Sequence, residues 1–331
     1  MGHQNQSTEP SETFQERILM KVGGGQNIQV VGLLVAWIIL IIVISRLAPY
    51  FLTMNNVLTI TKFSVTSFVA AAGMTIALIS GGLDLSLGAT MMVAGVVAGT
   101  LFTNGIPFIA ALIVGWLVGP IVGFINGTLI TRARINPLIA TLGMMFILRG
   151  TGYTIAGGKA RAIPDDIYQW ARESFAGIPI PVFIMAGILI ITYVMLSHTK
   201  LGRHIYAIGG NAQAARQAAM NVERYRLLIY TLAGCLSSLA GLILSSIISH
   251  IDPAAAQGRE LEIATAVLLG GASLEGGKGT IVGTLIGVLF ISSLYNGLVG
   301  LGVVPEWVPF INGALLIIAV AMDQLPRGGW R

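Results

Sequence analysis

Long apolar runs follow one another along almost the whole chain, separated by short polar or glycine-rich segments. A helix needs about 20 apolar residues to cross the roughly 30 Å hydrocarbon core of a bilayer. Segments such as Val31–Ser45 lack the apolar–polar alternation of membrane β-strands, which excludes an outer-membrane barrel. The pattern predicts an all-α, polytopic integral membrane protein with about ten transmembrane helices. We expect these spans at about 29–47, 59–80, 87–102, 106–130, 137–156, 181–196, 227–249, 263–274, 281–301 and 308–322.

The run at 263–274 is the weakest of the ten. With roughly 12 residues it is too short to span the hydrocarbon core as a straight helix. A re-entrant half-helix, enclosed by the other helices, is the alternative for this segment. The expected number of crossings is therefore eight to ten.

The composition supports a membrane protein, because only 10% of the residues are charged and 55% are hydrophobic. A soluble domain carries roughly 25% charged residues, so most of this surface is expected to face membrane lipid. The 42 glycines suit a membrane bundle, in which small residues let helices approach closely. We expect one transmembrane domain at 29–323, after a segment at 1–28 without the features of a cleaved signal peptide and before a short tail at 324–331.

Lysine and arginine residues gather in alternate connecting segments. If the N-terminus is cytoplasmic, twelve of them fall in inner segments and six in outer segments. Cytoplasmic loops of membrane proteins carry an excess of Lys and Arg, so the pattern predicts an N-in and C-in orientation. The net charge of +5 reflects these loops, and no nucleic-acid partner is expected.

The motifs of common enzyme classes are missing from the sequence. There is no GxxxxGK[ST] phosphate loop, no HExxH metal motif and no GxSxG nucleophile elbow. The single cysteine, Cys235, lies in an apolar run and cannot form an internal disulfide. We therefore expect no catalytic residues, no metal site and no cofactor bound by this chain.

An ion-coupled secondary transporter is one alternative class. Such proteins place ionisable groups near the bilayer centre to bind the coupling ion. Here the expected spans are almost free of charge, with Arg149 toward one end of its span, where it is expected to snorkel or to pair locally. Asp84 and Glu275 fall at glycine-flanked interruptions instead. The pattern favours a permease that takes its energy from another subunit.

The basic segment 198–226 is the most informative soluble part of the chain. Gly209 and Gly210 predict a flexible turn, and Asn211 is a good N-cap because its side chain can accept from free backbone amides. Ala212–Ala219 then favours a helix. A solvated connector is the plain interpretation of this segment, and a helix that docks on a motor subunit is the sharper one.

Two glycine-rich interruptions follow apolar runs and are candidates for a pathway or gate. Glycine relieves crowding and permits positive φ there, while helix ends with exposed amides also suit a path for hydroxylated ligands. Asp84 is expected to cap the helix that follows it. The candidate pathway or gate residues are Gly81, Gly82, Asp84, Ser86, Gly270, Gly271 and Ser273.

Six blocks in fixed order carry a family resemblance, and they lie within about residues 50–323. They are FLTMNN at 51–56, AGMT at 72–75, GGLDLSL at 81–87, ATLGMMFILRG at 140–150, LGRHIYAIGGNAQAARQAAMNV at 201–222 and LLGGASLEGGKGTIVGT at 268–284. The chain resembles the permease subunits of bacterial sugar importers of the ATP-binding-cassette class, the ribose/xylose/galactose (carbohydrate-uptake-2) group. It departs from that pattern at Ala219-Met220, where the group usually has Gly-Ile, and at Ala89, where Ser is frequent.

The resemblance implies a permease subunit in a bacterial inner membrane that forms the path for a pentose or hexose. It implies three protein partners: a cytoplasmic ATP-binding subunit that carries the ATP and Mg, a periplasmic sugar-binding protein, and a second permease subunit, identical or not. Branched-chain amino-acid permeases, more distant relatives, are the alternative for the substrate class. The residues that the resemblance assigns to ATPase coupling are Gly209, Gly210, Asn211, Ala214, Ala215, Arg216 and Asn221.

Overall fold

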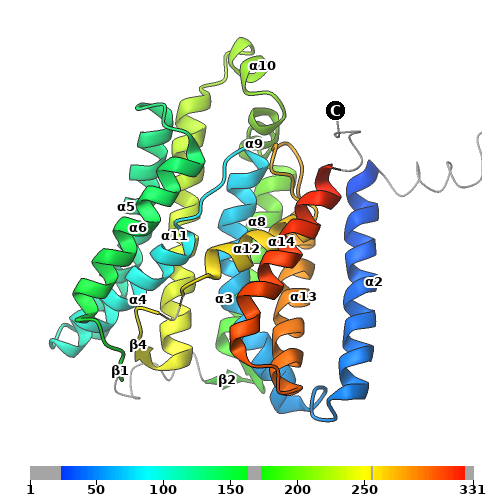
Figure 1. Cartoon of the computed structure of the whole chain (residues 1–331). Helices are drawn as coiled ribbons and strands as arrows, with labels where there is room; N and C mark the ends of the chain where they lie inside the picture. The colour runs from blue at the N-terminus through cyan, green and yellow to red at the C-terminus, as the bar shows by residue number, and fades with distance from the viewer. Residues whose placement is uncertain (1–23, 163–172, 255, 325–331) are drawn as a thin grey trace, which may run out of the picture.

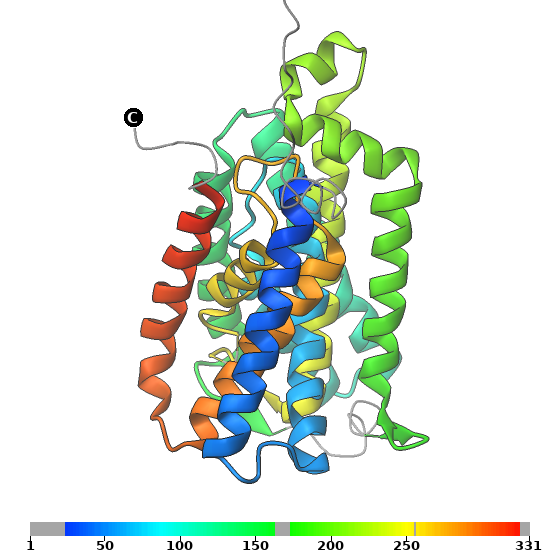
Figure 2. The same cartoon turned by 90° about the vertical axis from the view of Figure 1, so that its right-hand side faces the viewer.

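The computed structural model describes residues 24–162, 173–254 and 256–324, and these fold into a bundle of helices (Figures 1 and 2). Most of the expected segment 1–28 and of the tail 324–331 lies outside the described residues. The helices are α2 (Gly24–Leu47), α3 (Met54–Ile79), α4 (Leu87–Thr103), α5 (Phe108–Thr131), α6 (Pro137–Ala156), α8 (Ile180–His198), α9 (Lys200–Gly210), α10 (Ala212–Gln217), α11 (Val222–Ile248), α12 (Arg259–Leu269), α13 (Ile281–Gly300), the 3-10 turn η2 (Pro305–Trp307) and α14 (Val308–Gln324).

Strands are short and lie at one end of the bundle, opposite α10 (Figure 1). β1 (Arg161–Ala162) pairs antiparallel with β4 (His250–Ile251), and β2 (Ser174–Phe175) pairs antiparallel with β3 (Ile178–Pro179). The first pair joins the segment after α6 to the segment after α11. The expectation of an all-α polytopic membrane protein is thus confirmed in its main feature.

Seven of the described helices are long and apolar enough to cross a membrane, namely α2, α3, α5, α6, α8, α11 and α13. Among them α3 is the most buried, with Ser64–Ile79 inside the bundle, whereas α2 exposes most of its apolar side chains, including Ile39 and Ile42. A soluble protein rarely exposes such continuous apolar surface. The arrangement therefore suits α3 at the centre of a bundle whose outer helices face lipid or another membrane subunit.

The helices after α2 repeat one pattern of lengths. In α3–α6 a long helix is followed by a shorter one and two long ones. The first three helices of α11–α14 follow the same order, with an even shorter second helix, and α14 is as short as α4. The packing repeats as well, because α4 contacts α5 and α6 while α12 contacts α13 and α14. The two groups run in opposite directions (Figure 1), as in membrane transporters built from inverted repeats.

The segment expected at 263–274 is a half-helix. Helix α12 ends at Leu269, and its 11 residues are about 16 Å long, roughly half of the hydrocarbon core. It is enclosed by α3, α4, α13 and α14. Helix α12 is therefore as short as the half-helix alternative expects, and the apolar residues after Leu269 belong to a loop.

Glycine lets α5 and α11 pack with their backbones in contact. A Cβ added at Gly119 of α5 would collide with the carbonyl oxygen of Gly234, and one added at Gly234 would collide with that of Gly119. Gly123 lies equally close to the carbonyl of Tyr230. The expectation that glycine permits close helix approach is confirmed for this pair.

We predict that Gly119→Val destabilises the bundle by about 1–3 kcal/mol or more, because the added side chain has no space between α5 and α11. Gly187→Val in α8 is the matched control, since its Cβ would meet open space. Thermal denaturation of the detergent-solubilised protein measures the difference. Equal melting temperatures for the two variants would contradict the close packing.

Candidate coupling segment and helix breaks

Helix α9 lies across one end of the bundle, which we call the α10 end (Figures 1 and 2). The hydroxyl of Thr199 caps it by accepting from the amide of Gly202, at 3.2 Å. Gly202 lies directly against the carbonyls that end α8, so the chain can turn sharply there. Ile205 and Ile208 of α9 are buried on the side of the helix that faces the bundle. This half-buried helix therefore rests on the bundle while its other face is free for contact.

Helix α10 stands beyond α9 and projects furthest from the bundle (Figure 1). The side chain of Asn211 accepts from the amide of Ala214 at 2.9 Å, so the predicted N-cap is confirmed. Asn221 caps α11 in the same way, accepting from Arg224 at 3.0 Å. The segment between α9 and α11 thus contains a short helix, and capping side chains fix the N-terminus of α10 and that of α11.

Three positions of the predicted coupling segment differ from expectation. Gly209 and Gly210 form the last turn of α9 and are not a flexible turn. Ala215 is only 4% exposed and packs against Ile208 and Val222, so it supports α10 from inside and does not lie on a docking face. A helix of six residues is too short for its buried face to be read from sequence. The exposed residues of α10 are Gln213, Ala214, Arg216 and Gln217.

Arg216 is engaged within the chain. Its guanidinium donates from Nε and Nη2 to Glu223 at 3.1 and 3.0 Å, and both side chains are about half exposed. The pair ties α10 to the start of α11. It also forms one wall of a cavity of about 460 Å³, whose other walls include Arg134 and Arg226. The α10 end therefore combines an exposed helix with a predominantly basic hollow.

Ala219 occupies a position that normally takes glycine. Its φ is 61°. The amide of Ala219 donates a hydrogen bond to the carbonyl of Arg216, and the amide of Met220 donates one to the carbonyl of Ala215, which together form a Schellman motif. The chain thus bends sharply after α10, even though alanine replaces the glycine that is usual in the sugar-importer permease group that this chain resembles. The left-handed conformation strains any residue with a Cβ.

The two glycine-rich breaks begin with the same motif. After α3, Gly81 takes a φ of 78° and the amide of Gly82 donates to Ala77. After α12, Gly271 takes a φ of 92° and the amide of Ala272 donates to Val267. Both are Schellman terminations with glycine in the left-handed position. Gly270 has a different role, because it lies directly against the backbone of Gly283 and lets α12 pack onto α13.

Asp84 and Ser86 are buried and bonded to each other. The Asp84 carboxylate accepts from the amide and the hydroxyl of Ser86 at 2.9 and 2.6 Å, directly before α4. Asn126 of α5 donates to the Ser86 hydroxyl at 2.9 Å. Asp84 does not cap α4 itself as expected, because its carboxylate accepts hydrogen bonds from Ser86, which is the N-cap residue of α4. Ser273 bonds to Asp323 at 3.0 Å and connects its break to the end of α14.

The structure brings the predicted coupling residues and the predicted gate residues together. A Cβ at Gly209 would collide with the carbonyl of Ile79, the last residue of α3, and the same carbonyl accepts from the amide of Gly277 at 2.8 Å. A Cβ at Gly276 would lie 2.8 Å from the Cα of Gly81. We call these five residues the glycine junction. It joins the end of α9 to the beginning of one break and the end of the other.

Tyr206 adds a side-chain bond beside the glycine junction. Its hydroxyl donates to the carbonyl of Gly279 at 2.7 Å. Burial raises the pKa of this phenol, so it stays protonated and able to donate at neutral pH. Helix α9 is therefore attached to the 270–280 break by both backbone packing and a hydrogen bond.

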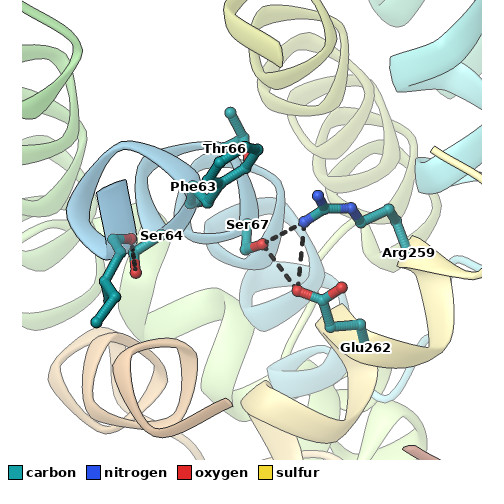
Figure 3. Close-up of polar contacts among 7 residues, drawn as sticks. Phe63, Ser64, Thr66, Ser67, Arg259 and Glu262 are labelled. Carbon is teal, nitrogen blue, oxygen red and sulfur yellow. Dashed lines mark hydrogen bonds and ion pairs between the residues drawn. The ribbon is translucent and has the colours of Figure 1, made fainter. Parts of the chain in front are cut away.

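The first turn of α12 carries three charged residues that sequence reasoning placed outside the membrane-spanning region or left unassigned. Figure 3 shows Arg259 and Glu262 turned toward Ser67 of α3. Arg259 donates to the Ser67 hydroxyl at 3.0 Å and lies 3.4 Å from Glu262, which accepts from Ser67 at 3.0 Å. These charged residues precede the expected span 263–274, and the structure brings them into contact with α3 inside the bundle.

Arg149 does not snorkel or pair locally. Its guanidinium donates to the carboxylate of Glu260, at 2.6 Å and 111 residues away in the sequence. Sequence spacing does not predict a contact between two residues that are this far apart in the chain. The only available signal was that a charge inside an apolar span needs a partner.

These features define a polytopic helical membrane protein with two interrupted helices in its interior and a capped helical segment at one end, the architecture of a transport protein. The chain belongs to the family described as branched-chain amino acid transport system / permease component, whose family model matches residues 56–320.

Curated relatives cover most of the chain. It is 38% identical over 320 residues to the ribose import permease protein RbsC of Bacillus subtilis, covering 96% of this chain and 98% of that protein. It is 37% identical to RbsC of Escherichia coli K12, covering 88% and 92%. The fructose import permease protein FrcC of Rhizobium meliloti is 35% identical, with 84% and 80% covered. No solved structure matches the chain.

We predict that Ala219→Gly stabilises the α10 segment by about 0.5–1 kcal/mol, because glycine relieves left-handed strain and loses part of that gain through its freer unfolded chain. Ala218→Gly is the control, since Ala218 has an ordinary φ of −80° and glycine there costs about 0.5–1 kcal/mol. Hydrogen exchange of the α10 amides should slow in the first variant and accelerate in the second. Slower exchange in Ala218→Gly alone would refute the assignment of strain.

Proposed function

We propose that this chain is the permease subunit of an ATP-driven importer for a monosaccharide, a pentose or a hexose. Its permease domain, at about 29–323, forms the translocation path, and ATP with Mg is bound and hydrolysed by a separate cytoplasmic subunit. The observation that carries the proposal is the glycine junction, which attaches the exposed α9–α10 segment to both interrupted helices. A mechanical connection of this kind is what a subunit driven from outside the membrane needs.

The α10 end is the proposed docking face for the ATPase subunit. Gln213, Ala214 and Gln217 are exposed on α10, and the side chain of Asn211 caps the N-terminus of this helix. The cavity of about 460 Å³ beside it, with its arginines, suits a polar or acidic segment of a soluble partner. The interior contacts of Ala215 and the pair of Arg216 with Glu223 keep α10 rigid enough to transmit force.

We further propose ten crossings with N-in and C-in orientation in a bacterial inner membrane. In Figure 1 the start of α2, the end of α14 and α10 all lie at the same end of the bundle, which supports an even number of crossings. The segment with α4 and the segment with α12 each complete a crossing as a helix plus an extended stretch. A cysteine introduced at Gln213 should react with an impermeant label from the cytoplasm and one at Asn104 from the outside. Swapped reactivity would reverse the orientation.

Two further partners belong to the proposal. A periplasmic sugar-binding protein would meet the end opposite α10, where a cavity of about 560 Å³ is lined by Tyr50, Thr53 and Asn56 among others. A second permease subunit, identical or paralogous, would cover apolar faces that this chain leaves exposed. The relatives named for ribose, fructose and allose favour a monosaccharide as substrate over a branched-chain amino acid.

Uptake into vesicles tests the proposal directly. We expect accumulation of ribose, fructose or allose to require the binding protein, the ATPase subunit and ATP, and to survive collapse of the proton gradient. Uptake by the purified chain alone, driven by an ion gradient, would favour an ion-coupled secondary transporter. Preferential uptake of leucine or valine would favour the amino-acid alternative.

The same assay tests the docking face. Ala214→Glu should weaken the complex with the ATPase subunit by about 1–3 kcal/mol, or about 5–150-fold, because it adds bulk and charge on the exposed face of α10. Ala214→Ser, which stays small and neutral, should behave like the parent. Ala215→Glu should lower the folded yield instead, since it places a charge among Ile208 and Val222. Normal uptake and co-purification of Ala214→Glu would remove α10 from the interface.

A further inference from the structure

The ion pair between Arg149 and Glu260 lies between the two groups of helices. Arg149 belongs to α6 of the first group and Glu260 to α12 of the second, and their side chains are 26% and 7% exposed. The second carboxylate oxygen of Glu260 is buried without a hydrogen-bond partner among the described residues. It points at α4, because a Cβ added at Gly88 would collide with it. The pair thus joins α6 to α12, and Glu260 also packs against α4.

A small cavity lies beside this ion pair. Its volume is about 40 Å³, and Arg149, Met92, Tyr153 and Gln257 are among the residues that line it. Such a volume holds one or two water molecules and no sugar. Arg149 and Tyr153 are partly exposed, and Gln257 is exposed, whereas Met92 is only 6% exposed. The cavity therefore has exposed residues on one side and the buried Met92 on the other.

Helix α12 connects the Arg149–Glu260 ion pair to the glycine junction. Glu260 is in its first turn, and its last residue, Leu269, is followed by Gly270, which packs against Gly283 of α13. The break that follows reaches the glycine junction at Gly276 and Gly277. An 11-residue helix is about 16 Å long and moves as one rigid piece. A displacement of α9 would therefore reach Glu260 through α12.

We propose that Arg149 and Glu260 form a gate on the translocation path, on the side opposite α10, and that α12 links this gate to the coupling segment through the glycine junction. The proposal rests on the proposed function, because it assumes that α9 and α10 move with the ATPase subunit. In the closed state the ion pair holds α6 against α12. When the ATPase subunit moves α9, the glycine junction displaces α12 and separates the carboxylate from the guanidinium. Gly209, Gly276 and Glu260 are then positioning residues for transport.

Cysteine accessibility in the complex tests the gate. Met92→Cys is placed in a Cys235→Ser background, the complex with the ATPase subunit is put into nanodiscs, and labelling by an impermeant maleimide is timed with and without a non-hydrolysable ATP analogue. A closed gate leaves the open form as a minor state of about 10% or less, so nucleotide should change the labelling rate about tenfold. A rate that ignores nucleotide, in a complex whose uptake is driven by ATP, would overturn the gate. Uptake without any need for ATP would speak against the proposed function itself.

Three variants separate the gate from a purely structural ion pair. Glu260→Gln should label fast in both states because the ion pair is lost, and Arg149→Gln/Glu260→Gln, which leaves no unpaired charge, should do the same in a stably folded protein. Gly209→Ala should hydrolyse ATP while its labelling rate no longer follows nucleotide, because the added methyl breaks the glycine junction. Gly150→Ala in α6, whose Cβ would meet open space, should match the parent. Nucleotide-dependent labelling that persists in the double glutamine variant and in Gly209→Ala would refute the gate and its link.

Discussion

The backbone of Gly209 lies in direct contact with the last carbonyl of α3, and much of the structure depends on this contact. Within a membrane bundle every backbone polar group needs a partner, and irregular segments survive only where they are buried in protein. The carbonyl of Ile79 is satisfied by the amide of Gly277, which belongs to the other break. Any side chain at position 209 would push α9 away from both. The end of α3, the end of α9 and the loop after α12 therefore form one unit.

This unit explains why the charged residues sit where they do. Interrupting a helix at 270–280 leaves α12 short enough to be enclosed, and its first turn then lies among α3, α4 and α6. Charges buried there must be paired. Ser67 satisfies Arg259 and Glu262 on one side, and Arg149 satisfies Glu260 on another. Both ends of α12 are thus attached, one by backbone packing and one by ion pairs, so a displacement at one end acts on the contacts at the other.

The sequence predicted the helices well because apolar runs of membrane length have few alternative folds. It also identified Asn211 as a cap, since a single side chain and three residues of helix decide that bond. The prediction of a flexible turn at Gly209 was wrong, because glycine is common in turns. Here glycine is needed for close contact with the carbonyl of Ile79, which is 130 residues away in the sequence. The pair of Arg149 with Glu260 was out of reach for the same cause. Long-range contacts decided Gly209 and the Arg149–Glu260 pair, whereas Ala215 was missed because a six-residue helix does not show from sequence which face is buried.

The exposure of Arg149 sets the cost of opening the proposed gate. Separating two fully buried charges would leave both without water, which costs several kcal/mol for each ion. The Arg149 side chain is already 26% exposed beside a cavity, while that of Glu260 is 7% exposed. Arg149 can therefore regain water as soon as the pair separates, and the main remaining cost is the carboxylate. Moving a gate from 1% to 99% open requires about 5.5 kcal/mol of differential binding. A pair with one hydrated partner keeps the cost within what a docked ATPase subunit can supply, whereas a dry pair would lock the path shut.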